Sequence, residues 1–238
     1  MYTITLSPRL TAIAELVRLG ARLADIGTDH GYLPAFLLQR GKIEYAVASD
    51  IRPGPLDRAV RTARAAGVED RMRFALADGL GSLRPGEADC VVIAGMGGET
   101  VAEILRQSVD IISSIVNIIV QPMTKAEKLR EALRPLGLAV RTELLVLDSG
   151  VLYPILVCAP GAGRVLTNAE LLVGQWELIS KAPLFPRYLD IQVVRLQRAL
   201  EGLGASSKEG DAIKIVTTQK NLNELLDMQR RMSHADSQ

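Results

Sequence analysis

Residues 22–34, Arg-Leu-Ala-Asp-Ile-Gly-Thr-Asp-His-Gly-Tyr-Leu-Pro, decide the fold. A short apolar run that carries Asp25 stops at Gly27, and a polar turn then leads into an apolar helical pattern. This order predicts a buried strand, a tight turn and a helix, with a ligand bound at the turn of an α/β sheet. Gly27 and Gly31 allow the backbone to bend sharply and to lie close against that ligand.

The turn matches a dinucleotide phosphate site poorly. The spacing of Gly27 and Gly31 is looser than the full glycine fingerprint of such sites. The Asp29 carboxylate between them would repel a pyrophosphate. The sequence therefore favours a ligand with a positive centre over a nicotinamide dinucleotide.

The composition bounds the class of protein. The 238 residues carry 28 basic and 27 acidic side chains, a balance that does not by itself indicate a nucleic-acid binder. Cys90 and Cys158 lie in apolar runs, which predicts buried free thiols in a reducing compartment and no Cys/His metal cluster. No apolar run approaches the roughly 18 residues of a membrane span, and the N-terminus lacks a signal pattern. We expect a cytoplasmic protein without a metal or a membrane partner.

Strand-like and helical patterns alternate through the first two thirds of the chain. Expected strands lie around Asp25 and at 45–50, 72–76, 89–94 and 115–120, and expected helices at 8–20, 32–40, 56–66, 99–106 and 125–136. The alternation predicts a parallel sheet covered on both faces, and 138–147 with 151–158 predict an antiparallel hairpin at one edge. The turns that follow the strands should therefore converge on one cleft.

The pattern changes after Pro160. Residues 161–163 read as a linker, and no further strand is expected. Leu189, Val193 and Leu196 begin a seam with steps of four and three that suits helix pairing, and a second helix is expected at about 213–232. We expect two domains, residues 1–159 and 160–238, of which the second is a coiled-coil-like antiparallel helical hairpin. Packing of these helices on the sheet remains the alternative.

Three successive strand ends carry Gly27, Asp50 and Asp78. The Asp50 carboxylate can accept both hydroxyls of a ribose, and Asp78, before Gly79, can accept an adenine amino proton. The ordinary alternatives are a solvated loop acid for Asp50 and an Asp-Gly turn for Asp78. In succession, the three positions resemble the S-adenosylmethionine-dependent methyltransferase fold, in which they hold methionine, ribose and adenine.

Several strings extend this resemblance to a family. They are Leu-Ser-Pro-Arg-Leu at 6–10, Ala-Asp-Ile-Gly-Thr-Asp-His-Gly-Tyr-Leu-Pro at 24–34, Gly-Glu-Ala-Asp at 86–89, Ile-Ala-Gly-Met-Gly-Gly at 93–98 and Gln-Pro at 121–122. Over essentially the whole chain, the sequence is similar to the bacterial tRNA (adenine-22-N1)-methyltransferase family. The resemblance implies a Rossmann-like class I methyltransferase sheet, S-adenosyl-L-methionine as cofactor, and methylation of adenine N1 in tRNA. A small-molecule methyltransferase and a non-catalytic module are the alternatives.

The resemblance and the strand-end pattern together assign candidate roles. We expect Asp29 and Gln121 to be catalytic, Asp29 by stabilising the positive charge that develops on the base. The expected cofactor-binding residues are Asp25, Gly27, Thr28, His30, Gly31, Asp50, Ile51, Asp78, Gly79, Leu80, Gly95 and Met96. The expected substrate-binding residues are Arg9, Gly97, Gly98, Pro122, Met123 and Tyr153.

The remaining expectations concern RNA recognition. Position 123 is methionine where the family usually has asparagine, so apolar contact replaces hydrogen bonds to a base edge. Arg52 and the series Arg58, Arg61 and Arg64 are candidate phosphate contacts or a solvated helix face. The helical hairpin could bind tRNA, support weak self-association, or do both.

Overall fold

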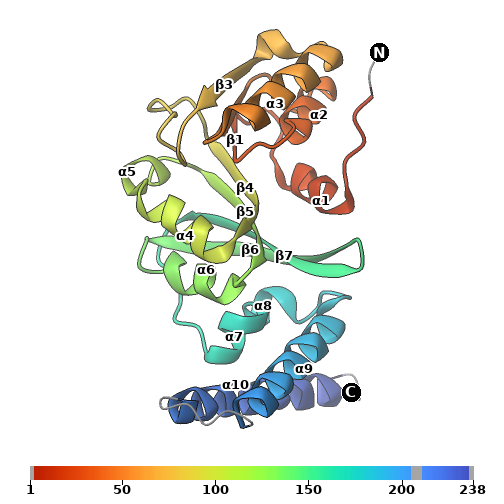
Figure 1. Ribbon diagram of the computed structural model, residues 1–238, viewed down its shortest axis with the longest axis vertical. Coiled ribbons are helices and arrows are strands. Elements are labelled where there is room, and N and C mark those ends of the chain that lie inside the picture. Colours follow the sequence, from red (N-terminus) through yellow and green to blue (C-terminus); the bar gives the residue numbers. More distant parts are fainter. Residues whose placement is uncertain (1–2, 205–210, 236–238) are drawn as a thin grey trace. The chain divides into compact units, whose positions relative to one another are not determined.

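Residues 3–204 and 211–235 are described in the computed structural model of the protein (Figure 1). The chain divides into two compact units, residues 1–164 and 165–238. In the described residues, the first unit contains the sheet and the second contains helices.

The first unit is built on a sheet whose described strands follow the order β3-β2-β1-β4-β5-β7-β6. The strands are β1 (Leu23–Ile26), β2 (Ala46–Asp50), β3 (Met72–Leu76), β4 (Cys90–Gly97), β5 (Asn117–Thr124), β6 (Leu138–Asp148) and β7 (Val151–Pro160). Strands β1 to β5 pair in parallel, and β7 is antiparallel to both β5 and β6. The predicted parallel sheet with an antiparallel hairpin at one edge is confirmed. The chain direction across the sheet reverses between β1 and β4, which is where such sheets bind ligands.

Helices cover both faces of this sheet. They are α1 (Pro8–Leu16), α2 (Tyr32–Gln39), α3 (Pro53–Ala66), the 3₁₀ helix η1 (Glu69–Arg71), α4 (Gly98–Arg106), α5 (Val109–Ile112) and α6 (Ala126–Leu133). Successive residues of a strand point to opposite faces. Cys90 and Val92 of β4 therefore join a core with α1, α2 and α3, whereas Val91 and Ile93 join a second core with α4, α5 and α6 (Figure 1).

Helix α1 begins where the sequence predicts and ends earlier. The Ser7 hydroxyl accepts the Leu10 N–H at 3.3 Å, and Pro8 occupies the first turn. The helix ends at Leu16 because Val17 is already extended. Gly20, the expected end, lies in the following turn with φ +73°.

Strands β4 and β5 run further than the sequence predicts. Gly95 has φ +81°, and the pairing register of β4 with β5 shifts between Ala94 and Met96. This bulge lets β4 continue to Gly97 instead of ending at Ala94. Its partner β5 likewise continues to Thr124, so Gln121 lies within a strand.

The interior of the first unit contains a buried ion pair and two buried thiols. Arg130 of α6 donates from Nε to Oε1 of Glu143 in β6 at 2.9 Å, and both side chains are fully buried. Cys90 and Cys158 are buried free thiols, as predicted, and burial raises the pKa of Cys90 to about 12.

The second unit contains two short helices before its long pair. The described helices are α7 (Asn168–Val173), α8 (Trp176–Ile179), α9 (Phe185–Gly204) and α10 (Asp211–Ala235). Gln229 near the end of α10 donates to Asp190 near the start of α9 at 2.7 Å, so the long helices are antiparallel, as predicted. A coiled-coil geometry stays a prediction. The polar composition of residues 204–211 also predicts a break between the two long helices, and residues 205–210 of it lie outside the described residues.

The short helices were not predicted. Thr167 and Glu170 form a capping box around the start of α7, in which the Thr167 hydroxyl accepts the Glu170 N–H at 3.1 Å. The Thr-x-x-Glu spacing is a sequence signal for a helix start. Across the described residues, the helices are too short or too polar to cross a membrane.

Candidate functional site

Two neighbouring cavities open at the point where the sheet order reverses. The first, the Asp78 cavity, has a volume of about 320 Å³ and contains Ile51 and Asp78 among its lining residues. The second, the Asp29 cavity, has a volume of about 410 Å³ and contains Asp25 and Asp29. Gly27, Asp50 and Met96 line both cavities. The strand ends at Gly27, Asp50 and Asp78 therefore converge, as predicted.

Met96 lies at the boundary between the two cavities. A Cβ built on Gly27 would lie 1.9 Å from the Met96 Cε, so this thioether rests against the glycine backbone. Gly27 has φ +75°, and the Gly27 and Thr28 N–H groups both donate to the Ser49 carbonyl, at 2.7 and 2.9 Å. The left-handed backbone conformation favours glycine here, and the flexible Met96 side chain would have to move to admit a Cβ.

A buried acid and a buried hydroxyl lie at the end of β1. Asp25 is 9% exposed, and its pKa is raised to about 6 because burial disfavours the charged carboxylate, with the Asp50 carboxylate adding to the rise. The Thr28 hydroxyl offsets part of this rise, although it is not in hydrogen-bonding geometry with any described group. A buried polar group without a partner is costly. These two groups suit a cationic, hydrogen-bonding ligand.

The Asp50 and Asp78 carboxylates and the Ile51 side chain are among the groups that line the Asp78 cavity. Asp50 ends β2, is 7% exposed, and accepts the Arg52 N–H at 2.8 Å. Ile51 is 62% exposed at the same cavity, where it offers a flat apolar contact. Leu80, predicted with this group, is fully buried in the core and does not line the cavity.

The rim of the Asp29 cavity carries paired charges. The Arg58 guanidinium donates to Asp29, and this hydrogen bond is the main reason why the pKa of Asp29 lies below its usual value. His30 Nε2 lies 3.5 Å from the other Asp29 oxygen. Asp29 is therefore ionised at neutral pH, but Arg58 neutralises part of its charge. The sequence did not predict this pairing, because 29 residues separate the two side chains.

The His30 ring stacks on Tyr32. The ring centroids are 5.1 Å apart, and the planes differ by only 4°. Both residues line the Asp29 cavity.

Gln121 is buried behind the cavities and its amide is engaged at both ends. Its Oε1 accepts the Arg9 Nη1 at 2.5 Å and the Gly95 N–H at 3.1 Å, and its Nε2 donates to the Pro122 carbonyl at 2.9 Å. Nε2 also lies 3.6 Å from the Met123 sulfur. Gln121 is 0% exposed. Its hydrogen bond with the Gly95 N–H holds the Gly95 bulge in place.

Arg9 links this bulge to the edge hairpin. Its Nε lies 3.7 Å from an Asp148 carboxylate oxygen, and its guanidinium lies 5.7 Å from the centre of the Tyr153 ring. Arg9 lines the Asp29 cavity, whereas Tyr153 does not. Sequence reasoning did not single out Asp148, because the Asp-Ser-Gly hairpin turn that carries it has an ordinary turn composition.

Packing within the protein explains Gly98, the second glycine after the bulge. A Cβ on Gly98 would lie 2.2 Å from the Lys125 carbonyl oxygen, whereas one on Gly97 would lie 3.4 Å from the Thr124 hydroxyl, an ordinary contact. Neither glycine lines either cavity. Gly98 therefore allows the start of α4 to approach the segment before α6.

The arginines of α3 are only partly available to a ligand. Arg58 pairs with Asp29, and Arg64 makes two hydrogen bonds with Glu69, each 2.9 Å long. Arg61 and Arg52 are exposed, and Arg52 lines the Asp29 cavity.

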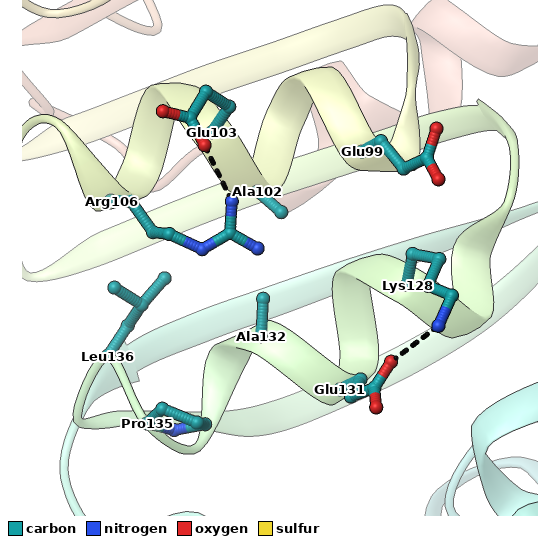
Figure 2. Close-up of a pocket in the computed structure, with 9 residues that line it drawn as sticks. All are labelled: Glu99, Ala102, Glu103, Arg106, Lys128, Glu131, Ala132, Pro135 and Leu136. Carbon is teal, nitrogen blue, oxygen red and sulfur yellow. Dashed lines mark hydrogen bonds and ion pairs between the residues drawn. The ribbon is translucent and has the colours of Figure 1, made fainter.

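A further groove lies between α4 and α6 and contains none of the predicted site residues. Figure 2 shows four of its charged side chains in two pairs, with Arg106 bonded to Glu103 at 2.7 Å and Lys128 to Glu131 at 2.9 Å. The groove has a volume of about 650 Å³. Its charges largely satisfy one another, so it offers no reactive group.

The comparisons with known proteins identify the class first. A model of the methyltransferase domain family matches residues 6–156, a range that includes every residue lining the two cavities. The fold, the acidic strand ends and this match define a methyltransferase domain.

Similar proteins narrow the class to a family. A Bacillus subtilis tRNA (adenine(22)-N(1))-methyltransferase is 34% identical over 78% of this chain and 80% of its own length. The crystal structure of the B. subtilis m1A22 tRNA methyltransferase TrmK aligns with a TM-score of 0.77 at 29% identity, over 97% of this chain and 98% of that one. M. capricolum TrmK, solved with S-adenosyl-homocysteine, aligns with a TM-score of 0.81 at 27% identity, over 94% and 98%. The chain belongs to the tRNA (adenine(22)-N(1))-methyltransferase family.

Proposed function

We propose that this protein transfers a methyl group from S-adenosyl-L-methionine to N1 of adenine 22 in tRNA. The observation that carries the proposal is the convergence of Gly27, Asp50 and Asp78 on two joined cavities, in a chain similar to such enzymes over most of its length. We also propose a cytoplasmic location, because tRNA is the substrate.

The residues present fit the cofactor. Asp25 and the unpartnered Thr28 hydroxyl suit the ammonium group of its methionine part, which would satisfy both. Asp50 suits the ribose hydroxyls, and Asp78 with Ile51 suits the adenine ring. Gly31, Gly79 and Gly95 would contribute backbone contacts. The cofactor supplies an electrophilic methyl group on a positively charged sulfur.

The chain contributes mainly by positioning the substrate. Adenine N1 already carries a lone pair, so its attack needs orientation and no general base. The methylated ring becomes cationic, and the ionised Asp29 at the cavity rim would stabilise that charge. Arg58 reduces this effect by pairing with the same carboxylate.

We assign Gln121 a positioning role. Its amide bonds to Gly95 and Arg9 and is fully buried, so it fixes the bulge beside which the base must lie. Pro122 and Met123 follow it in β5, and Met123 is 38% exposed, so an apolar base contact remains open to it. Arg9 and Arg52 would contact phosphates near the cavity.

The test is methyl transfer from labelled S-adenosyl-L-methionine to unmodified tRNA and to a transcript with guanine at position 22. Incorporation that disappears with guanine 22 supports both the chemistry and the target. Incorporation that persists moves the target to another nucleotide. No incorporation, with cofactor binding measured by calorimetry, would overturn the RNA assignment in favour of a small-molecule methyltransferase.

A further inference from the structure

The His30 ring stacks on Tyr32, whose side chain also packs against the core of the first unit. His30 lies in the turn between β1 and α2, and Tyr32 is the first residue of α2. The His30 side chain is 39% exposed even though Tyr32 covers one of its faces. A flat aromatic surface thus remains accessible at the cavity where methyl transfer is proposed.

The surroundings of this surface suit a nucleotide. The rings line the same cavity as Gly95 and Met96, which lie at the end of the sheet beside the proposed cofactor site. Arg52 also lines this cavity and is well exposed, so it offers a guanidinium to a phosphate that approaches the rings. Aromatic side chains bind unpaired bases through their faces, because every base has a flat π surface.

The nitrogen edge of His30 is already directed toward the protein. Nε2 lies 3.5 Å from Asp29, which is itself held by Arg58. The ring orientation is therefore fixed from one edge by Asp29 and from one face by Tyr32. The second face of the imidazole is therefore the main surface that remains accessible to a ligand. A face suits a base better than it suits the polar methionine part of the cofactor.

We propose that the target adenine stacks on the exposed face of His30, with Tyr32 supporting the ring from behind. This inference rests on the proposed function and changes the expected role of His30 from cofactor binding to base binding. Stacking would hold the adenine flat beside Met96 after it leaves the tRNA helix, a step that costs unstacking energy.

The experiment compares tRNA binding by wild type and variants, using substrate tRNA and the same tRNA without a base at position 22. His30→Ala removes the stacking face, and His30→Phe keeps a ring without nitrogen atoms. Tyr32→Phe keeps the supporting ring. Arg40→Ala is the matched control, because Arg40 lies at the far end of α2 and is exposed. Cofactor affinity is measured for every variant by calorimetry.

The expected result is specific to the base. His30→Ala should weaken binding of tRNA with adenine 22 by about 5- to 100-fold, and leave the cofactor affinity within about twofold of wild type. The same variant should bind the abasic tRNA as wild type does. His30→Phe, Tyr32→Phe and Arg40→Ala should bind both tRNAs normally.

Two results would overturn the inference. Equal loss of affinity for both tRNAs would mean that His30 does not contact base 22. A loss of cofactor affinity without a loss of tRNA affinity would return His30 to the cofactor site. Failure of the proposed function is a separate result, because wild type would then show no preference for the tRNA that carries adenine 22.

Discussion

Replacing Asp25 by asparagine should make the protein more stable and its cofactor binding weaker. Asp25 is buried at the end of β1, and its pKa rises from the usual 3.8 to about 6. The folded state therefore holds a proton that the unfolded state releases between these two values. The free energy of unfolding therefore falls as pH rises through this window. Above pH 6, the buried charge of Asp25 lowers it by the full amount, about 3 kcal/mol. Asparagine has nearly the same shape and carries no charge.

The magnitude can be tested by thermal unfolding of the ligand-free full-length protein between pH 4 and 8. At pH 8, Asp25→Asn should raise the melting temperature of the sheet unit by roughly 5–10 °C. At pH 4, where Asp25 is protonated in the folded state, the difference should nearly vanish. Asp70→Asn, an exposed acid in η1, is the control and should change little at either pH.

Cofactor binding should show the opposite effect. A buried carboxylate that pairs with the ammonium group of the cofactor contributes a charge-assisted hydrogen bond, so Asp25→Asn should weaken binding by roughly 10- to 100-fold at pH 8. Wild-type affinity should fall as pH drops through about 6, because the carboxylate then becomes protonated. A variant that is no more stable than wild type at pH 8, or that gains equally at pH 4, would refute the assignment of a costly buried charge.

Three further variants test other parts of the structure. Arg130→Met leaves the buried Glu143 carboxylate without its main partner and should lower the unfolding free energy by about 3–5 kcal/mol, whereas adding Glu143→Leu should restore most of the loss in urea denaturation. Gly31→Ala should reduce both stability and cofactor affinity, because residue 31 has a φ of +65° and the new Cβ would lie 2.9 Å from the Ala59 Cβ. A wild-type melting temperature together with a wild-type cofactor affinity in calorimetry would contradict this. Asp50→Ala should weaken cofactor binding by roughly 10- to 100-fold with an unchanged melting temperature, and calorimetry that gives wild-type affinity would remove Asp50 from the ribose site.

The sequence predicted the sheet and its ligand-binding edge because those signals are local. The run around Asp25 is apolar, Gly27 breaks it, and each later strand repeats this pattern of an apolar run followed by a turn. Asp50 and Asp78 could be placed in one cleft because parallel strands end at the same edge. No side-chain contact was needed for these predictions.

The features that sequence reasoning missed depend on contacts between distant segments. Gln121 was expected to be catalytic, but the bulge at Gly95 extends both strands, and the Gln121 amide is buried against Arg9 and Gly95. The pairing of Arg58 with Asp29 also needs the fold to bring α3 beside the first turn. In contrast, the Thr167 and Glu170 capping box was a local signal, so α7 could have been predicted.

The balanced net charge of the chain is consistent with an RNA substrate because of how the cleft distributes its charges. Arg9 lies near Asp148, Arg58 near Asp29 and Arg52 near Asp50, so each cation beside the cavities has a nearby acid. A fixed neighbouring acid keeps an arginine oriented. At distances beyond the Debye length of about 8 Å, however, the charge of the acid cancels most of the arginine's attraction for a phosphate. Long-range attraction is then weak, whereas a phosphate in contact can still bond to the remaining N–H groups of a guanidinium. The net charge of the chain reflects only the long-range electrostatic attraction for RNA, so it could not have indicated an RNA substrate.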